Sequence, residues 1–420
     1  MMPASNFMTP VRRFFTDRAW REEKVAAYAS IGLLVFLTSF FWAPTRDFMH
    51  VVYGLAFFVP VLFVLLFRQP DFNQYGGCFT GLALLYAGYA SISTLWSETP
   101  RLEFFAQHFV FLAVWLAGTA WLASRGQLNI ERLYRVLIVT GAAGSIVYQI
   151  GFHWINYPLD YGGDAGNRLG FVGFGVTRNP NTIGLIFGAT TLVAYIWWLQ
   201  SSGLRQGVLR FGLLTLNGVA VLVSLSRGSI IALAFVLALG FALFRGPSRK
   251  WLVHGTMVIG LLGLVAFGSQ QEAVVSTIQE RVNSKVFRTT IWSHVVHKSW
   301  HDHSLHGEGL TKTTRINVPE LMDELGPVPH AHNAYIDAFY WTGLTGLLLM
   351  CAHMVYVLRH WSNSPRILPL YLWFLFGCLT ALVDRPGFFE HLNSHWFGYW
   401  IPAGLIGALV MAERQKSSSA

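Results

Sequence analysis

The chain has 420 residues, of which 53% are hydrophobic and only 12% charged, and its formal net charge is +9. Soluble domains carry about 25% charged residues, so this composition excludes a soluble globule, a fibre and a disordered chain. It predicts an all-α polytopic membrane protein. The positive charge does not indicate nucleic-acid binding, because in a membrane protein the position of basic residues matters more than their sum.

Twelve apolar segments are long enough to cross a hydrocarbon core of about 30 Å as helices. They show no ten-residue alternation of the kind that β-barrel strands have. We therefore expect about twelve transmembrane helices, at residues 26–45, 48–67, 76–95, 104–123, 135–153, 180–199, 207–225, 229–245, 251–268, 332–357, 367–384 and 395–412.

The predicted organisation has three parts. Residues 1–268 hold nine helices with a short loop at 154–180, residues 269–331 form a large loop, and residues 332–420 hold three helices and a tail. Most of the 30 Lys and Arg residues fall on the side of the N-terminus. The positive-inside rule then places both termini in the cytoplasm and both of these loops in the periplasm.

The short periplasmic loop contains the first candidate binding residues. Arg168 and Arg178 flank a glycine-rich stretch that ends in Asn179-Pro180-Asn181. Pro180 suits the first turn of a helix, and Asn179 suits its N-cap. A helix start beside an arginine is a natural phosphate site. The alternative is a flexible loop followed by a capped helix.

Arg227 lies between two apolar helices with almost no loop around it. An arginine near the membrane boundary costs desolvation energy unless it snorkels or binds an anion. We interpret Arg227 as an anion clamp at the membrane face, with a snorkelling or helix-capping arginine as the alternative.

Two further arginines, Arg281 and Arg288, lie in the large loop and are seven residues apart, which places them on one face of a helix. Residues 286–300 read as an amphipathic helix. Such a helix could offer its arginines to a lipid-linked phosphate, or it could rest on the bilayer with its arginines among lipid headgroups.

Seven of the fifteen histidines fall between residues 294 and 332. The segment His301-Asp302-His303 with His306 could supply metal ligands, and so could His330 with His332, but the chain has neither an H-E-x-x-H nor a D-x-D pattern. We therefore expect this cluster to be mostly solvated loop, with no metal site.

His332 follows a chain-breaking Gly-Pro-Val-Pro stretch, and we expect it in the first turn of the next helix. The positive end of a helix favours the neutral imidazole that a general base needs near neutral pH. The alternative is a histidine that only caps the helix.

The segment from His332 resembles a known family. His332 and Asn333 are followed by nine residues, Gly343, two residues and Gly346, an H-N-x9-G-x-x-G pattern. This resembles the motif at the end of the large periplasmic loop in O-antigen ligases. Their wider family includes O-antigen polymerases, bacterial protein O-oligosaccharyltransferases and teichuronic acid polymerases.

Two other segments resemble motifs of that family. Residues 226–229, Ser-Arg-Gly-Ser, resemble its arginine motif at a helix start. Arg168 with Asn179-Pro180-Asn181 resembles its "R…NPN" segment, although the spacing is longer than the family's. Twelve helices with one large loop between the ninth and tenth also match its topology.

The resemblance implies a C-type membrane glycosyltransferase in the inner membrane of a Gram-negative bacterium, with a periplasmic active site. The implied donor is an undecaprenyl diphosphate-linked glycan, and the implied acceptor is a sugar hydroxyl of the lipid A–core oligosaccharide. The implied transfer inverts the anomeric centre without a metal or other cofactor. We expect a monomer surrounded by membrane lipids, with no nucleic-acid partner.

The predicted site follows from this chemistry. Arginines would stabilise the charge that grows on the departing diphosphate, and a histidine would take the proton of the acceptor hydroxyl or only position the diphosphate. The predicted catalytic residues are His332, Arg227 and Arg288. The predicted substrate-binding residues are Arg168, Arg178, Asn179, Arg281, His330 and Asn333.

Two competing functions remain. A polymerase or a protein O-oligosaccharyltransferase of the same family would share the donor and differ only in the acceptor. A flippase or secondary transporter would place ionisable residues near the membrane midplane, whereas the charges here collect at the outer face.

Overall fold

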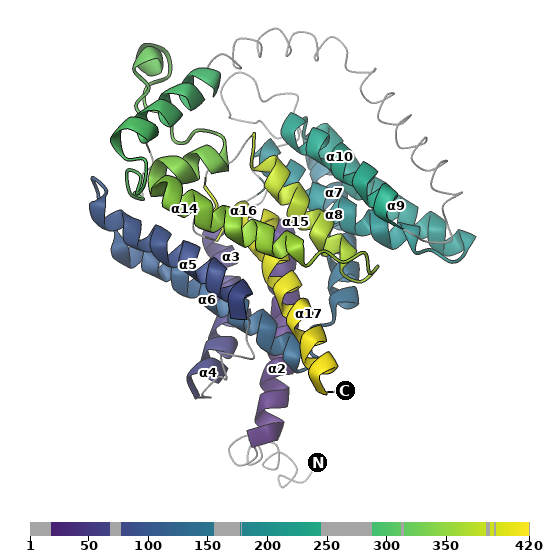
Figure 1. Ribbon diagram of the computed structural model, residues 1–420. Coiled ribbons are helices and arrows are strands. Elements are labelled where there is room, and N and C mark those ends of the chain that lie inside the picture. The colour runs from purple at the N-terminus through teal and green to yellow at the C-terminus, as the bar shows by residue number, and fades with distance from the viewer. Residues whose placement is uncertain are drawn as a thin grey trace, which may run out of the picture.

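The computed structural model describes residues 18–67, 77–154, 177, 179–244, 288–311, 315–383, 387–389 and 392–419. These residues are nearly all helical or in turns (Figure 1). Within them, extended pairing is limited to an isolated antiparallel bridge between Ile316 and Val328. The described residues therefore confirm the all-α class.

Nine helical segments of the described residues are long and apolar enough to cross a membrane. Two shorter apolar helices accompany them, α10 (Arg227–Leu243) and α15 (Leu368–Thr380). The nine are α2 (Arg18–Trp42), α3 (Arg46–Tyr53) continuing into α4 (Val59–Phe67), α5 (Gly77–Ser93), α6 (Leu102–Ser124), α7 (Ile130–Trp154), α8 (Pro180–Leu199), α9 (Leu204–Val223), α14 (Ala334–Arg359), and α16 (Ser394–Gly398) with α17 (Trp400–Ser419).

These helices confirm the prediction of a multi-pass membrane protein. Each predicted apolar segment but one overlaps a helix or helix pair, and the exception, 251–268, lies outside the described residues. The helix predicted at 367–384 is shorter than expected, because α15 ends at Thr380. The division of the chain at residues 268 and 331 stays a prediction.

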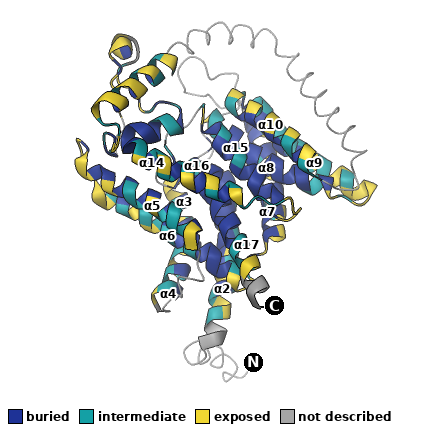
Figure 2. Ribbon diagram, viewed as in Figure 1, coloured by how far each residue is buried: buried dark blue, intermediate teal, exposed yellow. Residues whose placement is uncertain are grey.

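The centre of the bundle is α8, which packs against α7, α9, α10 and α15 and is mostly buried (Figure 2). Helix α9 is bonded to α7 and α8 through the side chain of its buried Asn217. Its Nδ2 donates to the carbonyl of Ile138 in α7 at 3.2 Å, and its Oδ1 accepts from Thr190 Oγ1 of α8 at 2.9 Å. Hydrogen bonds of this kind hold membrane helices together where the hydrophobic effect does not.

Helix α14 is interrupted at Gly343, whose φ of +64° is left-handed. The loop before α14 supplies hydrogen bonds at the break. The Glu308 N–H donates to the Tyr340 carbonyl at 2.9 Å, and the Leu344 N–H donates to the Ser304 carbonyl at 2.8 Å. A Cβ at Gly343 would overlap this loop backbone. The first glycine of the H-N-x9-G-x-x-G pattern is therefore needed for its φ and for close backbone contact.

The large loop carries structure of its own. Residues 288–302 form a helix, and residues 319–325 form a short helical stretch, η5 (Pro319–Leu321) with α13 (Met322–Leu325). The helix at 288–302, hereafter the loop helix, agrees with the predicted amphipathic helix from residue 288 onward. Residues 286–287 lie outside the described part of the chain.

Candidate functional site

Three predicted site segments meet at the C-terminal end of α15. Arg288 Nη1 of the loop helix donates to the Val383 carbonyl at 2.8 Å. The Ala334 N–H at the start of α14 donates to the Ala381 carbonyl at 2.9 Å. Both carbonyls belong to the turn that directly follows α15, which ends at Thr380.

The start of α10 approaches the same point through Gly228, since an added Cβ there would lie 2.5 Å from Val383 Cγ2. Arg227, the first residue of α10, is exposed. Ser226 is the N-cap, but its side chain makes no capping hydrogen bond and contacts Ser229 Oγ at 3.1 Å instead. An exposed arginine at the positive end of a helix suits the binding of an anion.

The loop helix presents two donors one turn apart. Arg288 is half-buried and holds the end of α15, as described above. Trp292 Nε1 donates to the carbonyl of Ala331 at 2.6 Å. The helix that carries a predicted catalytic arginine is therefore bonded directly to the segment that carries the two predicted histidines.

Residues 330–332 form a tight turn. The His332 N–H donates to His330 Nδ1 at 3.1 Å, and the two ring centroids are 4.1 Å apart. The Ala331 N–H donates to Asp337 Oδ1 at 2.9 Å. His332 itself has a φ of +56°, a left-handed conformation that is uncommon outside glycine.

The prediction that His332 lies in the first turn of the helix is wrong. Helix α14 begins at Ala334 with Asn333 as its N-cap, so His332 precedes the cap. The Asn333 Oδ1 accepts from the Tyr335 and Ile336 N–H groups at 3.0 and 3.2 Å. Asparagine is among the best N-cap residues, which explains why the helix starts after Asn333. The nearly buried side chain of Asn333 thus has a capping role.

The electrostatics of the turn favour a neutral His330. Burial, together with the nearby His332 and Arg288, lowers the pKa of His330 to about 3. Its Nδ1 accepts a hydrogen bond, which agrees with a neutral ring that carries its proton on Nε2. At neutral pH this histidine therefore adds no positive charge to the site.

The remaining predicted site residues fall into two groups. Asn179 is the N-cap of α8, where its Oδ1 accepts from the Asn181 N–H at 2.8 Å and Pro180 occupies the first turn, as predicted. It is exposed. The predicted residues outside the described part of the chain are Arg168, Arg178 and Arg281.

The histidines of the large loop do not assemble into a metal site within the described residues, where no three His, Cys, Asp or Glu side chains come together. The Glu308 carboxylate lies 2.8 Å from Lys298 Nζ and 3.9 Å from His303 Nε2. Burial opposes the charged form of Lys298, but the hydrogen bond and charge of Glu308 outweigh it and raise the lysine pKa.

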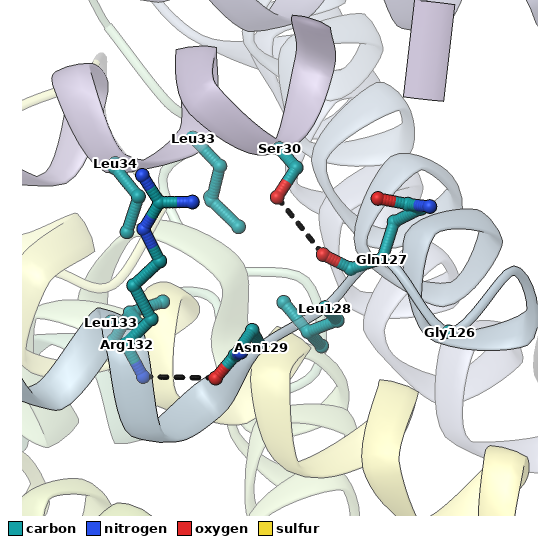
Figure 3. A pocket seen from close by; sticks show the side chains of 9 residues that line it. All are labelled: Ser30, Leu33, Leu34, Gly126, Gln127, Leu128, Asn129, Arg132 and Leu133. Atoms are coloured by element: carbon teal, nitrogen blue, oxygen red, sulfur yellow. Dashed lines mark hydrogen bonds between the residues drawn. The ribbon is translucent and has the colours of Figure 1, made fainter. Parts of the chain in front are cut away.

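A cavity of about 180 Å³ lies between α2 and the connection from α6 to α7 (Figure 3). Ser30 Oγ donates across it to the Gln127 carbonyl at 2.9 Å, and Asn129 Oδ1 accepts from the Arg132 N–H at 2.9 Å. It contains none of the predicted site residues, so we do not place the functional site there.

Two residues of the site were missed by the sequence reasoning. Trp292 and Asp337 bind the two backbone polar groups of Ala331. Asp337 had a detectable signal, since an acidic residue inside a predicted transmembrane segment is a candidate functional residue by default. Trp292 had none, because its spacing from Arg288 does not show where its indole N–H points.

The fold and this group of residues define a polytopic membrane protein that gathers arginines and histidines where α10, α14 and the loop helix meet the end of α15. The sequence profile of the O-antigen ligase family matches residues 211–351, which include Arg227, Arg288 and His332. The chain is 25% identical over 398 residues to the O-antigen ligase of Pseudomonas aeruginosa, an alignment that covers 92% of each protein. Residues 211–351 thus resemble the O-antigen ligase family, and the chain is similar over most of its length to a protein named O-antigen ligase.

Proposed function

We propose that this protein is an O-antigen ligase of lipopolysaccharide biosynthesis. It transfers an undecaprenyl diphosphate-linked O-antigen to a sugar hydroxyl of the lipid A–core oligosaccharide. The observation that carries the proposal is the meeting of Arg288, Gly228 at the start of α10 and Ala334 at the start of α14 around the residues that follow α15. The similarity to a protein named O-antigen ligase over 92% of the chain favours the ligase over a polymerase.

In the proposed reaction, the acceptor hydroxyl attacks the anomeric carbon of the donor sugar. The bond from that carbon to the bridging phosphate oxygen breaks, and undecaprenyl diphosphate leaves with the electron pair. Attack from the side opposite the leaving group inverts the anomeric centre. His332 takes the proton of the acceptor hydroxyl, a role that contributes about 10²–10⁴ in rate.

The departing diphosphate gains negative charge, and fixed cations aimed at it lower the barrier. We assign this role to Arg227 and Arg288, without a metal ion. Arg288 is suited to it because its Nη1 donates to the Val383 carbonyl, which fixes the position of the guanidinium. Arg168, Arg178 and Arg281 are proposed further contacts to the donor.

The proposed orientation follows from the distribution of Lys and Arg. The termini lie in the cytoplasm and the site faces the periplasm, in the inner membrane of a Gram-negative bacterium. Helix α2 begins and α17 ends at the same end of the molecule, as this orientation requires (Figure 1).

The test is a reconstitution of purified protein with undecaprenyl diphosphate-linked O-antigen and lipid A–core in detergent that contains EDTA. We expect laddered lipopolysaccharide from the wild type and none from His332→Ala. Lengthening of the glycan on its own undecaprenyl carrier would instead identify a polymerase. Transfer to a secreted protein, with no product on lipid A–core, would identify a protein O-oligosaccharyltransferase.

A further inference from the structure

Ala331 is held on both sides by side chains from two different helices. Its N–H donates to Asp337 Oδ1 of α14 at 2.9 Å, and its carbonyl accepts from Trp292 Nε1 of the loop helix at 2.6 Å. Side chains therefore bind both the N–H and the carbonyl of Ala331, the residue directly before His332.

The surroundings of Asp337 hold its carboxylate in position to accept the Ala331 N–H. Its side chain is fully buried, and it lies in the first turn of α14, where the helix dipole favours a negative charge. Its own N–H donates to the Asn333 carbonyl at 2.9 Å, so the carboxylate is anchored to the regular part of the helix. A buried carboxylate that accepts a backbone N–H is a rigid support.

His332 needs such a support. A left-handed φ costs free energy for a residue with a Cβ, and it persists only where the surrounding structure imposes it. The contact between the His332 N–H and His330 Nδ1 lies within the turn itself. The contacts that fix the turn to the rest of the protein include those of Asp337 and Trp292.

We propose that Asp337 and Trp292 are positioning residues that hold His332 in its left-handed conformation by binding Ala331 from opposite sides. The inference rests on the proposed function, in which His332 takes a proton from the acceptor. Because Trp292 lies one turn after Arg288, the same helix orients the cation and the base relative to each other.

The experiment compares Asp337→Ala, Asp337→Asn and Trp292→Phe in the reconstituted transfer assay. A misplacement of about 1 Å can lower a catalytic rate about 10²-fold, so we expect a loss of that order in kcat for Asp337→Ala with little change in KM. Asp337→Asn keeps an oxygen acceptor for the Ala331 N–H and should recover most of the loss. Trp292→Phe keeps the ring without the N–H and should lower kcat by about 10-fold or more.

Two controls separate positioning from general damage. Thr342→Val removes a buried hydrogen bond of the same helix, from Thr342 Oγ1 to the Ala338 carbonyl, and should leave kcat near the wild-type value. Undecaprenyl diphosphate should bind Asp337→Ala with the Kd of the wild type, because the arginines are unchanged. A merely unfolded variant would lose this binding.

Three results would overturn the inference while leaving the proposed function intact. These are wild-type kcat in Asp337→Ala, Asp337→Asn as slow as Asp337→Ala, and loss of undecaprenyl diphosphate binding together with activity. If the wild type itself transfers no glycan to lipid A–core, or if His332→Ala retains full activity, the proposed function fails instead.

Discussion

The starts of α10 and α14 are alike in one respect and opposite in another. Each is preceded by a non-glycine residue with a left-handed φ, Leu225 at +50° before Ser226 and His332 at +56° before Asn333. Elsewhere in the described part of the chain, positive φ values occur only at glycines. Such conformations concentrate at functional sites, and here one lies two residues before Arg227 and the other is at His332 itself, both predicted catalytic residues.

The two helix starts differ in whether a side chain caps the first N–H groups. The first N–H groups of α14 are capped by Asn333, and Asp337 fastens the preceding turn. At α10 the Ser226 side chain caps nothing, and Arg227 is exposed. One start thus holds a side chain in place, whereas the other leaves a cation and a positive helix end accessible to an anion.

Removal of the proposed base tests the start of α14. His332→Ala should lower kcat about 10²–10⁴-fold, because the acceptor hydroxyl loses its base. The measurement is the initial rate of lipopolysaccharide formation at saturating donor and acceptor. A histidine that only positions the diphosphate would instead give a pH–rate profile without a group that titrates near neutrality.

Substitution of Arg227 tests the start of α10. Arg227→Ala should lower kcat about 10²–10³-fold, the loss seen when a donor to a developing anion is removed. Arg227→Lys should also be impaired, because a lysine cannot bind a phosphate in bidentate fashion. Arg205→Ala is the matched control, since Arg205 is another exposed arginine in the first turn of a helix, α9. Equal rates in both alanine variants would refute the anion clamp.

A smaller effect compares the two caps directly. Asn333→Ala should lower the free energy of unfolding by about 1 kcal/mol, whereas Asn333→Ser should lose less, because serine also caps helices. Ser226→Ala removes no capping bond and should lower the stability less than Asn333→Ala. Thermal unfolding in detergent measures all three variants. If Asn333→Ser keeps stability but loses activity, Asn333 also contacts substrate.

The smallest effect is a pH dependence. The folded-state pKa of His330, about 3, lies below its unfolded value of about 6.5, so the unfolded chain takes up the proton first as the pH falls. The contribution of the neutral His330 to stability is therefore fully present above pH 6.5 and is lost progressively as the pH falls toward 3. His330→Gln should flatten the decline of the thermal midpoint between pH 6.5 and 4.5. An unchanged decline in this variant would contradict the lowered pKa.

Hydropathy predicted most of the helices because a membrane span requires a long apolar segment, and Asn179-Pro180 predicted the start of α8. Helix α10 begins at Arg227, two residues before the apolar segment predicted at 229–245 and within the segment that resembles a helix-start motif. Hydropathy also placed the start of α14 too early, at residue 332, because Asn333 is the N-cap. It could not predict that Arg288 contacts Val383, since these residues are far apart in the chain and no periodicity links them. The break in α14 at Gly343 could not be predicted either, because the hydrogen bonds at the break involve Ser304 and Glu308, and no sequence pattern links these residues to Gly343.

The length of α15 distinguishes it from the helices that surround it. At about 1.5 Å per residue, its 13 residues span about 20 Å, roughly two-thirds of a hydrocarbon core. Directly before its start, the Arg366 carbonyl accepts a hydrogen bond from Tyr134 of α7 at 2.9 Å. Directly after its end, Ala381 and Val383 accept hydrogen bonds from the start of α14 and from Arg288. Because α15 is too short to span the core alone, the segments bonded to its two ends complete this part of the bundle.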